Sequence, residues 1–180
     1  MDFQLSKSRI MSGLQCHKKL WLDVHSNFSD QPKSQYEAGN RFNEIIRKSY
    51  GVGVNLSKSK DISEAIKKTN EAIKNRVKVI YEGTFIYSET VVKVDVLINR
   101  DNKWELLEAK TSKEIKSDHI KDVAIQTFIL KKNNLDIEKT KLILINDQFI
   151  YKGDNNYKNL FYEKDITENV LSEENNCLLY

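Results

Sequence analysis

The segment that most constrains the fold of this chain runs from residue 91 to residue 111 and predicts an antiparallel β-hairpin. Residues 91–98 (VVKVDVLI) are rich in β-branched side chains, and residues 103–111 (KWELLEAKT) form a second largely apolar run. The four polar residues 99–102 lie between the two runs and supply the residue types that favour a turn. A polar loop at 112–118 and a helix that extends to about residue 132 follow.

Acidic residues interrupt this hairpin where a packed core would not accommodate them. Because side chains alternate along a strand, Asp95 is expected on the face opposite the one shared by Val92, Val94, Val96 and Ile98. Glu108 and Lys110 lie two residues apart and therefore share a face of the second strand. If the two polar faces lie on the same side of the sheet, Asp95, Glu108 and Lys110 converge.

Two carboxylates and an ammonium group at one sheet edge fit metal-assisted hydrolysis. Carboxylate oxygens are ligands that Mg²⁺ prefers, and the cation lowers the pKa of a bound water. A lysine beside it can orient that water or stabilise a pentavalent phosphorus. The alternative is an exposed cross-strand ion pair worth under about 1 kcal/mol. Glu114 and Lys116 have the same spacing as Glu108 and Lys110 but follow no apolar run, so context distinguishes Glu108.

The order of these residues resembles the PD-(D/E)XK nuclease superfamily, with Glu82, Asp95, the run Glu108-Ala109-Lys110 and then Gln126 in the next helix. Within it, the chain is most similar to the RecB-like branch that includes the CRISPR-adaptation exonucleases. Residues 5–9 and 13–22 (LSKSR and GLQCHKKLWL) resemble the start of a poorly characterised bacterial family in that branch. The resemblance continues through residues 124–126 and 160–161, and so covers nearly the whole chain.

The resemblance implies a fold, an activity and a set of roles. The fold would be α/β, a restriction-endonuclease-like core with a mixed central β-sheet flanked by helices. Asp95, Glu108 and the Ala109 carbonyl would hold Mg²⁺ or Mn²⁺, and Lys110 would be the catalytic lysine. Gln126 would lie near the metal-bound water and the DNA backbone, and Glu82 would be an accessory acid that also serves the metal. The activity would be cleavage of single- or double-stranded DNA.

Three features depart from the family pattern. RecB-like nucleases usually place a metal-binding His in the preceding helix, where this chain has Asn43 and Glu44, so Glu44 is the candidate oxygen ligand. Position 130 is Leu where a Tyr often follows the Gln. The iron–sulfur relatives use one early and three late cysteines, whereas this chain has only Cys16 and Cys177, so no cluster is expected.

Charge and hydropathy are consistent with a nucleic-acid partner and no membrane partner. The net charge of +3 permits DNA binding, for which the candidate residues are Lys7, Arg9, Lys113, Lys116 and His119. A solvated basic face is the alternative for the N-terminal lysines. No apolar run reaches transmembrane length, no secretory signal is present at the start, and the two cysteines do not suggest a disulfide framework. These observations predict a cytoplasmic protein.

The expected organisation is a single domain over residues 1–180, with a helical part at 1–77, a catalytic sheet–helix core at 78–152 and a C-terminal tail and helix at 153–180. Apolar periodicity predicts helices from about residue 13, at 35–50, 61–76 and 165–174, and strands at 79–87, 140–146 and 148–152. The family resembled tends to occur as the front portion of longer proteins, so two alternatives stay open: a further domain or protein partner beyond residue 180, or a shortened stand-alone version of the family. Two alternatives to a nuclease remain open. One is a catalytically weak, nuclease-derived module for nucleic-acid binding or assembly, and the other is a purely structural partner-binding domain.

Overall fold

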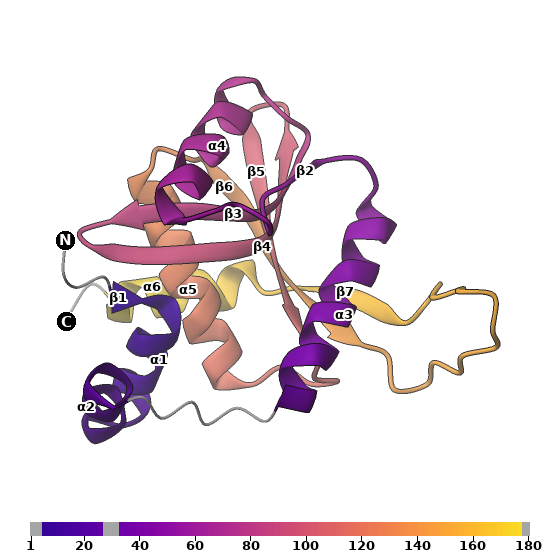
Figure 1. The fold of residues 1–180 in the computed structure, drawn as a ribbon, viewed down its shortest axis with the longest axis horizontal. Helices are drawn as coiled ribbons and strands as arrows, with labels where there is room; N and C mark the ends of the chain where they lie inside the picture. The colour runs from indigo at the N-terminus through magenta and orange to yellow at the C-terminus, as the bar shows by residue number, and fades with distance from the viewer. Residues whose placement is uncertain (1–4, 27–32, 178–180) are drawn as a thin grey trace.

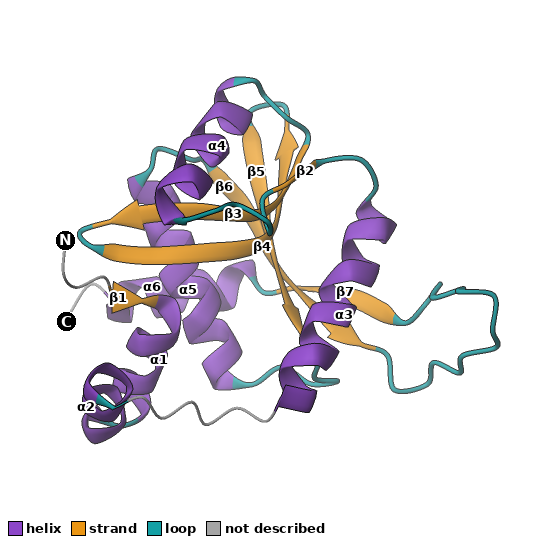
Figure 2. Cartoon of the chain, in the orientation of Figure 1, coloured by secondary structure: helices purple, strands orange, loops and turns teal. Residues whose placement is uncertain are grey.

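A mixed seven-stranded β-sheet with helices on both faces forms the centre of the computed structural model, which describes residues 5–26 and 33–177. The strands are paired in the order β2-β3-β4-β5-β6-β7, and β1 pairs with β4 outside that path. Figures 1 and 2 show this arrangement. The strands are β1 (Leu5–Ser6), β2 (Val54–Asn55), β3 (Val79–Tyr87), β4 (Thr90–Arg100), β5 (Lys103–Lys110), β6 (Ile137–Ile145) and β7 (Phe161–Asp165). The helices are α1 (Lys7–Gln15), α2 (His17–His25), α3 (Lys33–Tyr50), α4 (Ile62–Lys74), α5 (Ser117–Lys132) and α6 (Thr167–Cys177). The expected α/β class with a mixed sheet is therefore confirmed.

The predicted hairpin is present as the antiparallel pair β4 and β5. Asp101 and Asn102 form its turn with φ angles of 54° and 74°, a left-handed conformation that Asp and Asn tolerate better than most residues. After β5, helix α5 crosses over the sheet and leads into β6, which pairs parallel to β5. The expectation that the strand at 140–146 returns to the same sheet is confirmed.

Two apolar cores lie on the two faces of the sheet. On one face, α4, α5 and α6 cover a core that includes Ala72, Val123 and Val170, together with side chains from β3 to β6. On the other face, α3 contributes Phe42 and Ile46 to a smaller core. The apolar stripe on one face of α4 follows the periodicity of the sequence. Asp61 caps the N-terminus of this helix, and its carboxylate accepts from the Glu64 amide at 2.8 Å.

The side-chain alternation of β4 changes at its centre, which the sequence pattern did not predict. Val92 and Val94 contact the core under α5, whereas Val96 and Ile98 contact the core under α3, so these four residues do not share one face. Glu82 lies opposite this point in β3 and has a left-handed φ of 58°. A non-glycine residue in that conformation costs about 1 kcal/mol or more and interrupts the regular alternation of the strand pair.

Two other expectations about local structure are wrong. The first helix begins at Lys7 instead of near residue 13, because the Ser6 hydroxyl caps it, and extended backbone at Cys16 separates α1 from α2. Residues 148–152 form no strand. They belong to the connection that projects from the body of the molecule in Figure 1, and β7 pairs with the edge of β6 instead. Within the described residues, no helix is long and apolar enough to cross a membrane.

Candidate functional site

The acidic residues meet where β4 and β5 separate. The two strands pair from Arg100 and Lys103 at the turn as far as Val96 and Leu107. Beyond that point β5 continues along β6, whereas the other end of β4 pairs with β1. Asp95 is the next residue of β4 beyond the last pair, and Glu108 is the next residue of β5. We call this place the fork, and its position explains why two acids can come together inside a sheet.

Asp95 is held by two amide donors that bridge the fork. The side-chain amide of Asn43 on α3 donates to Asp95 Oδ1 at 3.1 Å, and the backbone N–H of Ala109 donates to Oδ2 at 2.8 Å. Burial, together with the nearby charge of Glu108, raises the pKa of Asp95 to about 8. The carboxylate is therefore fixed in direction, and its ionised form is one that a cation would stabilise.

Glu108 is buried between two ammonium groups. Lys7 Nζ and Lys110 Nζ each donate to its Oε1 at 2.9 Å. Burial acts to raise the pKa of Glu108, but the two lysines outweigh that effect and hold the pKa well below its ordinary value. The second oxygen, Oε2, is buried and has no hydrogen-bond partner among the residues that the structure describes. Buried acceptors of this kind are rare and call for an explanation.

Helix α5 adds a third acid and an amide. Asp122 is buried, forms an ion pair with Lys7 at 3.0 Å, and accepts hydrogen bonds from Lys110 and from the Gln126 side chain, the latter at 3.0 Å. Burial acts to lower the pKa of Lys110, but the charges of Glu108 and Asp122 together raise it above its ordinary value. Gln126 is fully buried, and its Oε1 also lacks a partner among the described residues.

Of the two remaining acids of the predicted site, Glu82 lies near Asp95, whereas Glu44 lies away from the fork. Glu82 bonds to Arg47 and Lys93, each at 3.4 Å, and its charge contributes to raising the pKa of Asp95. Glu44 does not join the fork. Its side chain is exposed and pairs with Lys48 at 3.2 Å. The preceding residue, Asn43, contacts Asp95 instead, because adjacent residues on a helix point about 100° apart.

The residues predicted to bind DNA divide into a buried and a peripheral group. Lys7 is part of the fork itself, and Arg9 lies half-buried on the same helix α1. His119 lies on the first turn of α5, where burial and the charges of Lys110 and Lys116 lower its pKa. Lys116 is exposed at the N-cap of α5, and Lys113 is exposed with Asp147 at 3.7 Å.

Sequence reasoning missed Asp122 and the position of Lys7. Asp122 lies one helical turn before Gln126, so its placement on the same face of α5 was available from the spacing alone. Lys7 and Glu108 are separated by 101 residues, and the pairing of β1 with β4 and the packing of α1 against α5 bring them together. No local signal could have predicted that contact.

The donor set fits a hard cation only in part. Across residues 5–26 and 33–177, no group of three or more His, Cys, Asp and Glu side chains is arranged to hold a metal ion. The fork nevertheless offers two carboxylates, one of which has a buried oxygen without a partner, and the backbone of Ala109 beside them. Oxygen ligands of this type suit Mg²⁺ or Mn²⁺, with water completing the coordination.

Comparisons with known proteins add little. No protein-family model matches the chain, and no curated protein matches it. Among solved structures, one described as "Crystal structure of SSO0001" shares 14% identity with this chain. The alignment covers 96% of this chain and 86% of that one with a TM-score of 0.33, a value too low to support any conclusion about fold or function.

Proposed function

We propose that the chain is a metal-dependent nuclease that hydrolyses phosphodiester bonds of DNA. The observation that carries the proposal is the Glu108 carboxylate, which is buried and ionised at the fork beside Asp95 but leaves Oε2 without a partner in the described structure. A core carboxylate with a purely structural role would be expected to pair both oxygens. A buried carboxylate oxygen without a partner in the described structure could bind a divalent cation. This agrees with the role that the resemblance to PD-(D/E)XK nucleases implies for Glu108.

In this proposal each residue of the fork has a defined role. Asp95, Glu108 and the Ala109 carbonyl hold Mg²⁺ or Mn²⁺. The cation, when bound, supplies a water of lowered pKa and stabilises charge on a phosphoryl oxygen. Lys110 keeps its proton because its pKa is raised, and it therefore acts as an electrostatic partner for the attacked phosphate and not as a base.

The amide side chains around the fork orient the reactants. Gln126 has a buried acceptor oxygen without a described partner, which is available to a water molecule. Asn43 fixes Asp95 where related nucleases use a histidine, so it acts as a positioning residue in place of a metal ligand. Lys113, Lys116 and His119 at the start of α5, with Arg9 on α1, are the candidate contacts to more distant DNA phosphates.

The test is degradation of end-labelled single- and double-stranded DNA with Mn²⁺. Wild-type protein is compared with Glu108→Ala and Lys110→Ala, and Glu114→Ala serves as the matched control because Glu114 lies in the second, exposed Glu-x-Lys run. We expect cleavage by the wild type and the control and its loss in both fork variants. Circular dichroism verifies that each variant is folded. Absence of cleavage by folded wild-type protein would overturn the proposal.

A nuclease-derived module that binds nucleic acid without cleaving it is the second candidate. Two observations favour it: Lys7 and Lys110 both donate to the same Glu108 oxygen, and Asn43 stands where a ligand is usual. In that case DNA binding would weaken steeply with salt, and both fork variants would retain it.

A further inference from the structure

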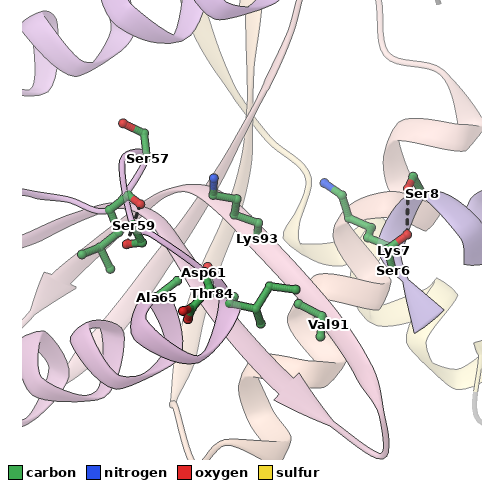
Figure 3. A pocket seen from close by; sticks show the side chains of 12 residues that line it. Ser6, Lys7, Ser8, Ser57, Ser59, Asp61, Ala65, Thr84, Val91 and Lys93 are labelled. Carbon is green, nitrogen blue, oxygen red and sulfur yellow. Dashed lines mark hydrogen bonds between the residues drawn. The ribbon is translucent and has the colours of Figure 1, made fainter. Parts of the chain in front are cut away.

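A pocket of about 460 Å³ lies beside the fork, between β1, the beginning of α4 and the β3–β4 hairpin (Figure 3). Two lysines of its wall pair with nearby acids, one at the fork and one on β3. Lys7 donates to Glu108 at 2.9 Å, and Lys93 lies 3.4 Å from Glu82 and two residues before Asp95 on β4. In Figure 3 the side chains of Lys7 and Lys93 extend toward the same end of the pocket. This end therefore carries two ammonium groups, of which Lys7 is paired with Glu108 and Asp122 and the more exposed Lys93 is paired with Glu82.

The rest of the lining divides into hydroxyl groups and apolar side chains. The hydroxyl groups come from Ser6, Ser8, Ser57, Ser59 and Thr84, and the apolar groups from Leu56, Ile62, Ala65 and Val91. Asp61 is the one acid of the lining, and its carboxylate is engaged as the N-cap of α4, where it accepts from the Glu64 amide. A small-molecule site of this size combines an apolar floor with a few polar groups that fix orientation.

We propose that this pocket holds the nucleotide that neighbours the scissile phosphodiester. Lys93 and Lys7 contact its phosphates at the charged end, the serine hydroxyls contact the sugar and phosphate oxygens, and the apolar floor contacts the base. The volume is of the size that one nucleotide occupies, and the proposed occupant is an unpaired nucleotide. The inference rests on the proposed nuclease function, because Lys7 connects the pocket to Glu108, one of the acids proposed to hold the metal.

The first test measures DNA binding under conditions that prevent cleavage. Fluorescence anisotropy of a labelled oligonucleotide is recorded in a chelator at low salt for Lys93→Glu and Val91→Phe. Lys93→Glu reverses the charge of the exposed lysine, and Val91→Phe fills part of the pocket. Lys67→Glu, on the exposed face of α4, and Thr90→Phe, the half-buried neighbour of Val91, are the matched controls because neither residue lines the pocket.

We expect about tenfold weaker binding for both pocket variants, a loss of the size that one phosphate or base contact provides. Both controls should bind within about twofold of the wild type. A scan with single abasic sites sharpens the result. One position should weaken wild-type binding about fivefold, and the same position should have no effect in Val91→Phe, whose pocket excludes the base.

The outcomes separate this inference from the proposed function. If the pocket variants bind DNA as tightly as their controls, or if no position of the abasic scan stands out, the pocket is not a nucleotide site. Manganese-dependent cleavage by the wild type is measured separately, and its presence would keep the nuclease proposal intact in that case. Pocket-dependent binding without cleavage would instead support the pocket and overturn the nuclease.

Discussion

Strand β5 carries two buried glutamates, Glu105 and Glu108, on opposite faces of the sheet, and they are used differently. Glu105 places Oε1 near Arg100 at 3.8 Å and Oε2 near Lys141 at 3.3 Å, so both oxygens face a cation. Glu108 receives two lysines on Oε1, whereas no residue that the structure describes bonds to its Oε2. Both residues are glutamates, but both oxygens of Glu105 lie near a cation, whereas in the described part of the chain only one oxygen of Glu108 does.

The cluster around Glu105 is closed by its neighbours. Lys141 also bonds to Glu163 at 3.0 Å, and the Tyr50 hydroxyl donates to the other oxygen of Glu163 at 2.6 Å. Burial and the charge of Glu163 raise the pKa of Tyr50, so its hydroxyl remains a donor. This cluster lies where β5 is paired with both β4 and β6, next to an irregularity of the β5–β6 register at Trp104 and Glu105, whereas Glu108 lies where β4 has left β5. The difference between the two glutamates is that Glu105 is flanked by a paired strand on each side, whereas Glu108 has lost its β4 neighbour and keeps an acceptor oxygen that a ligand can use.

The largest expected effect separates the two glutamates by activity. Glu108→Gln should lower Mn²⁺-dependent DNA cleavage by about 100-fold or more, because it removes a charge aimed at the transition state. Glu105→Gln should leave cleavage within about twofold of the wild type. Initial rates on the same labelled DNA give the comparison. Equal losses of cleavage rate in both variants would mean that Glu108 has no larger role in activity than Glu105.

Stability should show the reverse order. Lys141→Met removes the cation that Glu105 and Glu163 share and should lower the free energy of unfolding by about 2 kcal/mol. Lys110→Met should cost less, because Lys7 still contacts both Glu108 and Asp122. Urea unfolding in a chelator measures both values. A larger loss for Lys110→Met would show that the fork is held together by its own ion pairs as tightly as the closed cluster.

The sequence predicted the elements of the fork better than their arrangement. Strand β3, the β4–β5 hairpin and α5 followed from apolar periodicity and turn residues, which are local properties. Counting along the two strands predicted that Asp95, Glu108 and Lys110 converge if their polar faces lie on the same side of the sheet, although the alternation assumed for β4 was wrong at its centre. These steps need no information from distant parts of the chain, and the structure places these three residues at the fork.

The remaining features depend on contacts that a single sequence does not encode locally. The alternation of β4 changes opposite Glu82 because of one left-handed residue, which no periodicity reveals. Lys7 reaches the fork through a two-residue strand, β1. Residues 148–152 have the apolar pattern of a strand, but the edge of β6 pairs with β7 instead, and Ile150 is left 74% exposed. A strand pattern predicts a strand only where an unpaired edge is available.

Binding of Mn²⁺ should raise the free energy of unfolding through the fork and not through the cluster around Glu105. A ligand that binds only the folded state stabilises it by about 1.4 kcal/mol when its free concentration is ten times its Kd. We expect this gain in the wild type and in Glu105→Gln, and its loss in Asp95→Asn. Mg²⁺ should act in the same direction. An equal gain in Asp95→Asn would place the cation elsewhere on the molecule.

A further expected effect is a difference in the slope of stability against pH, which for a single group stays below about 1.4 kcal/mol per pH unit. The pKa of Asp95 is raised from 3.8 to about 8, so its contribution to stability is fully present below about pH 4 and is lost as the pH rises toward 8. The pKa of Glu163 is lowered from 4.5 by its Tyr50 and Lys141 bonds, which outweigh burial, so its contribution is present above about pH 4.5 and is lost as the pH falls. In a chelator, Asp95→Asn should therefore flatten the loss of stability between about pH 5 and pH 8, whereas Glu163→Gln should flatten the loss on the acid side. Urea unfolding across this range measures both slopes, and an Asp95→Asn profile parallel to the wild type would show that Asp95 is ionised in the folded protein without a cation.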